Sequence, residues 1–269
     1  MKRVFETLVD VPLWDGVPPL HRPEDDTLRE HFRDDDDFCH RLTDVSRPTL
    51  TFYPASGPGP HPCVLVCPGG GYEILAYNHE GTDVAHWLVS QGLSVALLKY
   101  RCPNRPDQAL ADARRAMRVI RANADDWFVD PARVGILGFS AGAALSVRTC
   151  CSTEPDYPHA DATDGLSARP DFAFIVYPAY LYREGWGIDP QLSVTKETCP
   201  ETFLVQSQDD PYWESSIAYS IALRKAGVPF ELHLLPDGGH GWGMIHWGHS
   251  TETWTGLAMR WFRTQVMHS

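Results

Sequence analysis

A serine flanked by glycines is the first stretch of this sequence that could do chemistry. Within VGILGFSAGAALS, Ser140 lies between Gly138 and Gly142, after an apolar run typical of a buried strand and before a segment typical of a helix. The small neighbours allow a sharp turn with the serine at its apex, so that its hydroxyl projects outward and the N–H of Ala141 faces the start of the helix. Taken alone, the pattern also fits a plain glycine turn in which the serine caps the helix.

Two later segments supply the partners that a nucleophilic serine needs. A serine hydroxyl is a weak nucleophile at its ordinary pKa and requires a base, which in turn requires a group to orient it. QSQDDPYW places Asp209 and Asp210 at the end of a strand, and LLPDGGHGWG places His240 in a glycine-rich loop after the next strand. The order serine, aspartate, histidine, each directly after a strand, predicts a triad that transfers acyl groups.

A run of three glycines follows an earlier strand. In CVLVCPGGGY, the backbone N–H groups of Gly69, Gly70 and Gly71 come directly after the apolar run. Together with the N–H of Ala141, they are predicted to hold the oxyanion of a tetrahedral intermediate. A plain glycine turn is the alternative interpretation.

Aromatic residues lie close to these motifs in the sequence. Flat rings near a reactive serine can pack on a sugar face or an aryl ester, although such rings also fill cores and interfaces. The residues predicted to form a substrate pocket on this basis are Tyr72, Trp186, Tyr212, Trp213 and Trp242.

Strand and helix patterns alternate from residue 48 onward. The predicted strands are CVLVCP, LSVALLKY, RVGILGF, DFAFIVYP, TFLVQSQ and FELHLLP, and the predicted helices are GTDVAHWLVSQG, QALADARRAMRVIRANADDW, SSIAYSIALRKAG and TETWTGLAMRWFRTQV. This alternation predicts an α/β fold with a mostly parallel central sheet and helices on both faces. Because ligands bind at the carboxyl ends of parallel strands, the motifs would converge on one edge of the sheet.

The chain is expected to consist of an arm and one domain. Residues 1–47 show little periodicity and predict an irregular N-terminal arm, whereas no repeat or linker divides residues 48–269, which predict a single catalytic domain. The acidic run Asp34–Asp37 lacks the spaced ligands and turn glycine of a metal loop, so a solvated surface is expected there.

Composition and charge argue against several classes of protein. A formal net charge of −12 disfavours a nucleic-acid partner, because binding to phosphates needs a concentrated basic surface. No secretion signal is visible and no apolar run approaches the roughly 20 residues that span a bilayer, so a cytoplasmic protein without a membrane partner is predicted. The seven cysteines show no metal-type spacing and are expected to be reduced, mostly buried thiols.

The motifs call for neither a metal nor an organic cofactor. HEG at His79 lacks the second histidine of the HExxH zinc motif, because Asp83 occupies that position, and a structural role near the first helix is predicted. GILGFSAG does not match the glycine pattern of dinucleotide-binding loops, which disfavours a nicotinamide cofactor.

Similarity to a known family extends well beyond the serine motif. CPGGGY, HEGTDVAHWLVSQG, LKYRCP, DPARVGILGFSAG, LSARPDFAFIVYP, ETFLVQSQDDP and ALRKAGVPFELHLLPDGGHGWGM resemble, in the same order, segments of the acetylxylan-esterase-like α/β-hydrolases, also called xylanase-related esterases or lipases. The resemblance covers roughly residues 48–247. It implies an α/β-hydrolase fold and favours Asp210 over Asp209 as the residue that orients His240.

The sequence departs from the family pattern at three places near the expected site. Pro68 stands where the glycine loop usually has histidine, Ala143-Ala144 stands where Gly-His is common, and Pro211-Tyr212-Trp213 replaces a frequent Val-Val-Pro. These departures leave the triad intact and put the shape of the substrate pocket in question.

The resemblance implies a serine esterase that hydrolyses short-chain acyl esters, above all acetyl esters, on carbohydrates. The alternatives are a general carboxylesterase, another acyl hydrolase such as an arylformamidase-like amidase or a peptidase, and a hydrolase fold kept only as a binding module. The expected partner is a small-molecule or oligosaccharide ester. The sequence is compatible with a monomer and with a homo-oligomer.

Overall fold

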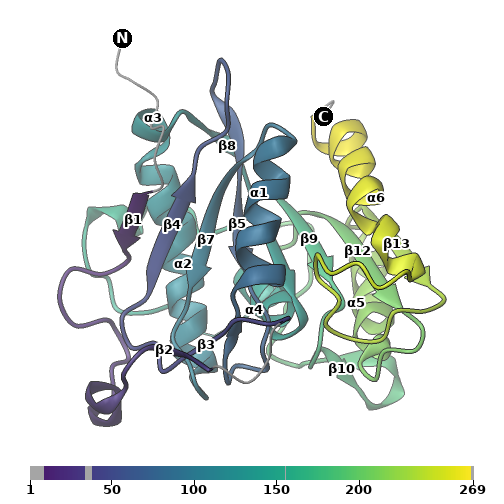
Figure 1. Ribbon diagram of the computed structural model, residues 1–269, viewed down its shortest axis with the longest axis horizontal. Coiled ribbons are helices and arrows are strands. Elements are labelled where there is room, and N and C mark those ends of the chain that lie inside the picture. Colours follow the sequence, from purple (N-terminus) through teal and green to yellow (C-terminus); the bar gives the residue numbers. More distant parts are fainter. Residues whose placement is uncertain (1–8, 34–37, 155, 268–269) are drawn as a thin grey trace.

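A central eight-stranded sheet dominates the computed structural model, which describes residues 9–33, 38–154 and 156–267 (Figure 1). In order across the sheet, the strands are β1 (Val9–Pro12), β4 (Thr49–Tyr53), β7 (Ser94–Lys99), β5 (His61–Cys67), β8 (Val129–Phe139), β9 (Phe172–Val176), β12 (Glu201–Ser207) and β13 (Phe230–Leu235). The six strands from β7 to β13 are parallel, and β4 and β1 continue the sheet antiparallel at one side.

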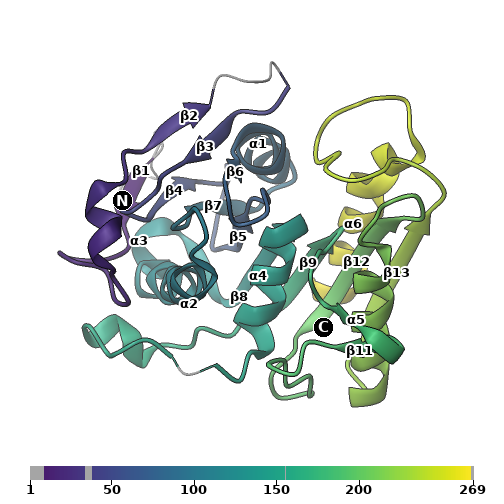
Figure 2. The same cartoon turned by 90° about the horizontal axis from the view of Figure 1, so that it is seen from below.

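Helices cover both faces of this sheet (Figure 2). On one face, buried apolar side chains of α2 (Pro106–Ala122), α4 (Ser140–Cys151) and α5 (Trp213–Ala226) pack against the strands. On the other face, α1 (Asp83–Ser90) and α6 (Trp254–Trp261) bury a second apolar cluster. The short helix α3 (Ala124–Trp127) separates α2 from β8. The mostly parallel central sheet with helices on both faces, predicted from the alternating pattern, is confirmed.

The central strands read as nearly continuous apolar runs because both of their faces are covered. Every residue of β9 is buried, and so is every residue of β5 after His61. The parallel pairing of β5 with β8 sets Val66 opposite Leu137 and Cys67 opposite Gly138, so the two strands end side by side. The glycine loop and the serine turn therefore begin at neighbouring points on one edge.

Three short strands lie in the segment that the sequence predicts to be an irregular arm. β1 pairs with β4 in the central sheet, and β2 (His31–Arg33) and β3 (Arg41–Thr43) form a small sheet with β6 (Leu75–Ala76). Strands of three or four residues are too short for an alternating pattern to stand out, and for that reason the prediction missed them. Asp34–Asp37 lie outside the described residues.

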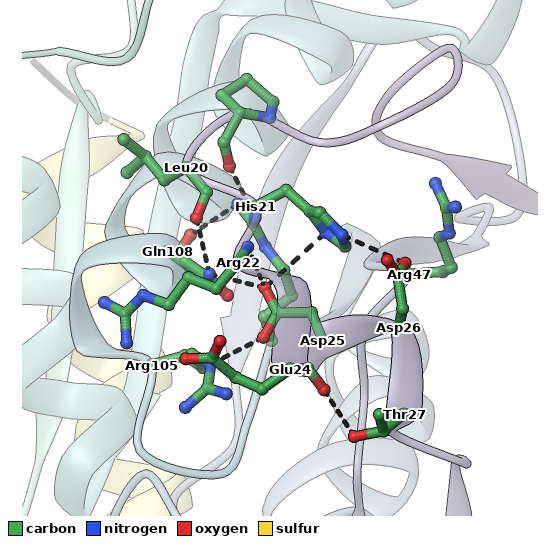
Figure 3. Close-up of polar contacts among 12 residues, drawn as sticks. Leu20, His21, Arg22, Glu24, Asp25, Asp26, Thr27, Arg47, Arg105 and Gln108 are labelled. Atoms are coloured by element: carbon green, nitrogen blue, oxygen red, sulfur yellow. Dashed lines mark hydrogen bonds and ion pairs between the residues drawn. The ribbon is translucent and has the colours of Figure 1, made fainter.

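A buried carboxylate anchors the arm to the start of α2 (Figure 3). The side chain of Asp25 is 1% exposed and accepts hydrogen bonds from Arg105 Nε at 2.8 Å and from Gln108 Nε2 at 2.9 Å. The backbone N–H of Arg22 donates to the same carboxylate at 2.8 Å. Burial alone would raise the pKa of Asp25, but these donors outweigh it and hold the pKa below its ordinary value.

The described residues test the expectations about cysteines, membrane-spanning helices and metal sites. All seven cysteines are free thiols, and all except Cys39 are buried. Among the residues that the structure describes, none of the helices has the length and apolar character to cross a bilayer. Within the same residues, no group of three or more histidine, cysteine, aspartate or glutamate side chains is arranged to hold a metal ion.

Candidate active site

The turn that carries Ser140 joins β8 directly to α4. Ser140 is the first residue of α4 and has a φ of 52°, a left-handed conformation that is strained for a residue with a side chain. A Cβ on Gly138 would lie 2.2 Å from the carbonyl oxygen of Gly142, and a Cβ on Gly142 would lie 2.1 Å from that of Cys67. The two glycines are therefore required for close packing around the turn, while the serine itself adopts the unusual backbone conformation.

Ser140, His240 and Asp210 form a continuous chain of hydrogen bonds. Ser140 Oγ lies 2.8 Å from His240 Nε2, and His240 Nδ1 lies 2.6 Å from Asp210 Oδ2. The carboxylate is fully buried, and its other oxygen accepts the N–H of Tyr212 at 2.7 Å. With one oxygen held by the backbone, the carboxylate presents the second to the imidazole in a fixed direction.

Asp209 has a different environment from its neighbour. It is exposed and accepts the backbone N–H groups of Gly239 at 2.8 Å and Gly238 at 3.3 Å. The N–H of Gly239 is the main cause that lowers the pKa of Asp209 below its ordinary value. The structure thus brings Asp210 to the histidine and uses Asp209 to hold the loop that carries it.

The glycine loop lies against the serine turn. A Cβ on Gly69 would lie 2.9 Å from Ser140 Cβ, and Gly70 and Gly71 have φ values of 125° and 66° that favour glycine. The N–H of Gly69 donates to the Glu80 carboxylate at 2.6 Å, so the prediction that Gly69 supplies an oxyanion donor is corrected. A backbone N–H makes one strong hydrogen bond, and this one is already made.

Three other backbone donors are placed near the serine. Ala141 lies in the first turn of α4, where backbone N–H groups have no partner within the helix. Gly70 and Gly71 line the same cavity as Ser140, and no protein acceptor is found for their N–H groups among the described residues. An oxygen bearing negative charge next to Ser140 can be reached from this side.

A cavity of about 410 Å³ opens in front of the serine. Its polar floor contains Ser140, His240, His79 and Glu80, and much of its wall is apolar or aromatic. The apolar and aromatic lining residues are Phe38, Ile74, Ala76, Tyr180, Tyr212, Ile245 and Trp247.

The five aromatic residues predicted for the pocket lie in different surroundings in the structure. Only Tyr212 lines the cavity, and its ring lies 5.0 Å from that of His240. Trp242 is 2% exposed and packs in the apolar cluster against Tyr177 and Trp254, so its assignment to the pocket is wrong.

The other three aromatic residues also lie away from the lining of this cavity. Tyr72 packs against Tyr100 and Tyr180. Trp186, at the turn between β10 (Tyr182–Arg183) and β11 (Gly187–Ile188), is 44% exposed and contacts Trp213. Proximity in the sequence to a motif residue did not predict which ring faces the cavity, because adjacent residues point in different directions.

Several lining residues were missed by the sequence analysis. Tyr180 lies four residues after the end of β9, in the loop that leaves the same sheet edge, and this position was the signal available for it. Ile245 and Trp247 belong to the loop that continues from His240. In the sequence, Glu80 stands out only as part of the HEG segment. Its hydrogen bond with the N–H of Gly69 depends on the fold.

The N-terminal arm contributes one wall of the cavity. Phe38 and Arg41 line it, and β3, which contains Arg41, pairs with β6 directly after the glycine loop. The side chain of Asn78 ties this wall down, since it accepts the N–H of His40 at 2.8 Å and donates to the carbonyl of Phe38 at 2.9 Å. The arm is therefore part of the site.

Comparison of the sequence with known proteins finds a matching family model and a curated relative. The family described as BD-FAE matches residues 51–164. An acetylxylan esterase of Xylanibacter ruminicola is 30% identical over 238 residues, which cover 78% of this chain and 47% of that protein. The chain thus spans about half the length of this curated relative.

Two solved structures resemble the whole fold. The acetyl ester-xyloside bifunctional hydrolase from Caldicellulosiruptor lactoaceticus is 32% identical, with a TM-score of 0.78 and coverage of 95% of this chain and 96% of that one. MGS-M1, an α/β-hydrolase from a deep-sea metagenome library, has a TM-score of 0.63 at 24% identity, with coverage of 87% and 96%, and shows the fold alone. The match to the bifunctional hydrolase covers nearly all of both chains at 32% identity, and the two proteins share the fold. The chain therefore belongs to the acetylxylan-esterase-like family of α/β-hydrolases.

Proposed function

We propose that this protein is a serine esterase that hydrolyses short-chain acyl esters, with acetyl esters of carbohydrates as its main substrates. The observation that carries the proposal is the hydrogen-bonded chain from Ser140 through His240 to Asp210, at 2.8 and 2.6 Å, at the floor of an open cavity. A binding module would have no need of this arrangement. The names of the acetylxylan esterase and of the acetyl ester-xyloside hydrolase support acetyl groups on xylan-type sugars as the substrate class.

The reaction begins with attack of Ser140 Oγ on the acyl carbon while His240 Nε2 takes the hydroxyl proton. Asp210 holds the imidazole in the tautomer that accepts this proton and stabilises the imidazolium that forms. The carbonyl oxygen becomes an oxyanion, which the N–H groups of Ala141, Gly70 and Gly71 hold in place of Gly69.

Collapse of the tetrahedral intermediate releases the alcohol and leaves an acyl-enzyme. His240 returns its proton to the departing alkoxide, so the alcohol leaves neutral. A water molecule then attacks the acyl carbon as His240 removes its proton, and a second collapse frees the carboxylic acid and regenerates Ser140. In this cycle the protein supplies the nucleophile, the base and the oxyanion donors, and water is the second substrate.

The lining of the cavity leaves room for varied alcohols. Gly70, Gly71 and Ile74 line the cavity together with the serine, and Tyr180, Tyr212 and Trp247 are exposed around it. Exposed aromatic rings can pack on the apolar face of a sugar, and they accept aryl or alkyl groups equally well. A general carboxylesterase is therefore the second candidate, and its support is the apolar lining.

Labelling by a fluorophosphonate probe tests the chemistry, and a substrate panel tests the specificity. We expect the probe to modify wild-type protein at Ser140, and Ser140→Ala to abolish both labelling and hydrolysis of p-nitrophenyl acetate. Full hydrolysis by Ser140→Ala would refute the mechanism.

Among acetylated xylo-oligosaccharide, p-nitrophenyl octanoate and an N-formyl arylamine, we expect the first to have the highest kcat/KM. A preference for the octanoate would favour the general carboxylesterase, and a preference for the formyl amide would favour an amidase.

A further inference from the structure

Glu80 is a buried carboxylate beside the reactive serine that the mechanism above does not use. It is 3% exposed, and each of its oxygens accepts one hydrogen bond. The N–H of Gly69 donates to Oε2 at 2.6 Å, and the hydroxyl of Tyr177 donates to Oε1 at 2.8 Å. The two donors replace hydrogen bonds to water that the Glu80 carboxylate loses on burial.

Tyr177 continues this connection toward the histidine loop. It lies directly after β9, is fully buried and has a φ of 34°. Its hydroxyl oxygen accepts the N–H of Gly243 at 2.9 Å, three residues beyond His240, and its ring lies 5.2 Å from the imidazole. Burial, with Glu80 nearby, raises the pKa of Tyr177 well above its ordinary value, so the hydroxyl keeps the proton that it donates.

His79 adds a second link between the same two regions. Its carbonyl oxygen accepts the N–H of Met244 at 2.9 Å, and a Cβ on Gly243 would lie 2.5 Å from that oxygen. The imidazole Nε2 of His79 lies 3.8 Å from Glu80 Oε1. The segment that contains His79 and Glu80 therefore contacts both the glycine loop and the loop that follows His240.

The three side-chain hydrogen bonds form one path from Gly69 through Glu80 and Tyr177 to Gly243. At one end, Gly69 immediately precedes the oxyanion donors of Gly70 and Gly71. At the other end, Gly243 belongs to the loop that places the base. All four residues of the path are buried, so the loss of one link leaves a buried polar group without its partner.

We propose that Glu80 and Tyr177 are positioning residues that set the distance between the oxyanion donors and His240. Neither residue takes part in bond making, and both act through the loops that they join. The stabilisation of a transition state depends steeply on this kind of placement, since a displacement of about 1 Å can reduce the rate by roughly 100-fold. The proposal rests on the esterase function proposed above.

Glu80→Gln and Tyr177→Phe test the path with nearly constant volume. A glutamine has one acceptor oxygen, so it can accept from Gly69 or from Tyr177 but not from both. Phenylalanine keeps the ring and removes the hydroxyl that joins Glu80 to Gly243. For each variant we expect kcat on p-nitrophenyl acetate to fall by on the order of 10- to 100-fold, with KM within about threefold of wild type.

The double variant separates a path from two independent contacts. If the residues act through one path, the first substitution already breaks that path, and the double variant will lose about as much kcat as the worse single variant. If they act independently, the two fold-losses will multiply, and that result would overturn the proposal. An increase in KM at unchanged kcat would also overturn it, because it would place the effect on substrate binding.

Tyr100→Phe is the matched control. Tyr100 is also a fully buried tyrosine, and its hydroxyl donates to the carbonyl of Pro68 at 2.7 Å. Among the described residues, no hydrogen bond joins this hydroxyl to the loop that carries His240. We expect this variant to lose a similar amount of thermal stability and to keep kcat within about twofold of wild type. An equal loss of kcat in Tyr100→Phe would reduce the effect to general destabilisation and overturn the proposal.

Failure of the proposal is distinguishable from failure of the esterase assignment. If wild type is not labelled by the fluorophosphonate and hydrolyses no ester, the assignment fails. If wild type is active and folded Tyr177→Phe and Glu80→Gln both keep wild-type kcat, only the positioning role fails. Should Glu80→Gln not fold, Tyr177→Phe compared with Tyr100→Phe decides the question by itself.

Discussion

The edge of the sheet that carries Ser140 and the junction between the arm and α2 are both held together by buried polar groups, with contrasting geometry. At the edge, Ser140, His240 and Asp210 are linked by one hydrogen bond at each step. At the junction, Arg101 and Asp112 are both fully buried, and Arg101 Nε contacts both carboxylate oxygens, at 2.9 and 3.1 Å.

The two clusters also differ in the number of hydrogen bonds that hold each polar side chain. At the junction, Trp14 Nε1 donates to Asp112 at 3.0 Å and Arg101 donates to the carbonyl of Pro19 at 2.7 Å, so several bonds hold each charge. Left-handed backbone conformations occur in both places, at Ser140 and Tyr177 at the edge and at Leu20 at the junction. Such conformations cost about 1 to 3 kcal/mol each and persist where the surroundings enforce them.

The contrast separates a cluster built for stability from one built for reactivity. A serine with every hydrogen bond satisfied by protein would have no electron pair to offer a substrate, so the edge must leave part of its polar groups available. The junction has no such requirement and can be saturated. Substitutions at the edge should therefore reduce activity far more than stability, and substitutions at the junction should do the reverse.

The largest effect is expected from Asp210→Asn. An asparagine keeps the shape but cannot hold the imidazole in the required tautomer, and in comparable triads this change lowers kcat by about 10⁴-fold. We expect a loss of that order in kcat on p-nitrophenyl acetate, with a melting temperature close to wild type. Asp209→Asn is the matched control and should lose less than about tenfold. A greater loss in the control would reverse the assignment of the two aspartates.

The next effect concerns the junction and is expected in stability. Asp112→Ala leaves the Arg101 charge buried without its partner, which typically destabilises a protein by about 3 to 5 kcal/mol. Unfolding in urea will measure the loss, and kcat per folded molecule should stay within about twofold of wild type.

Asp107→Ala is the control for that measurement. Its partner Arg22 is 38% exposed and Asp107 is 42% exposed, so the pair should contribute no more than about 1 kcal/mol. If Asp112→Ala instead retained full stability and lost activity, the separation of the two clusters would be wrong.

Acid should weaken the junction through Asp25. The pKa of Asp25 is lower in the folded protein than in the unfolded chain, so its contribution is complete above the unfolded value of 3.8 and is lost as the pH falls through the folded value. We expect Asp25→Asn to be less stable than wild type at pH 7, by about 1 to 3 kcal/mol. The difference between the two proteins should shrink as the pH falls below about 4. A difference that stayed constant between pH 6 and pH 3 would contradict this account.

The smallest effect is expected where the arm reaches the cavity. Phe38→Ala removes an exposed ring from the cavity wall, and we expect KM for a bulky ester to rise roughly two- to fivefold through lost apolar contact, with no change in melting temperature. Phe32→Ala, an exposed phenylalanine of the same arm on β2, should leave KM unchanged. Equal effects of the two variants would indicate a general response of the arm.

Sequence patterns predict the structure best where a residue type has one chemical use at one place in a fold. The strands were placed within a few residues because their apolar runs are covered on both faces, and the order of Ser140, Asp210 and His240 followed from the strands that precede them. Asp209 and Asp210 could not be separated by the residues themselves, since both follow the same strand. Only the direction of each side chain distinguishes them.

The errors share a physical cause. Gly69 and Gly70 look alike in the sequence, yet the N–H of Gly69 is bonded to a glutamate 11 positions further along the chain. Trp242 lies two residues from His240 and packs in the apolar cluster against Tyr177 and Trp254. Such outcomes depend on neighbours from distant segments, which no local pattern records.

The sequence by itself determined the α/β architecture, the order of the motif residues and the family, because each follows from local periodicity or from the succession of short motifs. Only the tertiary structure decided which backbone donors remain unpaired, which aromatic rings face the cavity, and that the arm forms one of its walls. These properties arise from contacts between loops far apart in the chain. The link from Gly69 through Glu80 and Tyr177 to Gly243 is of this kind, since its four members come from four separate segments of the fold.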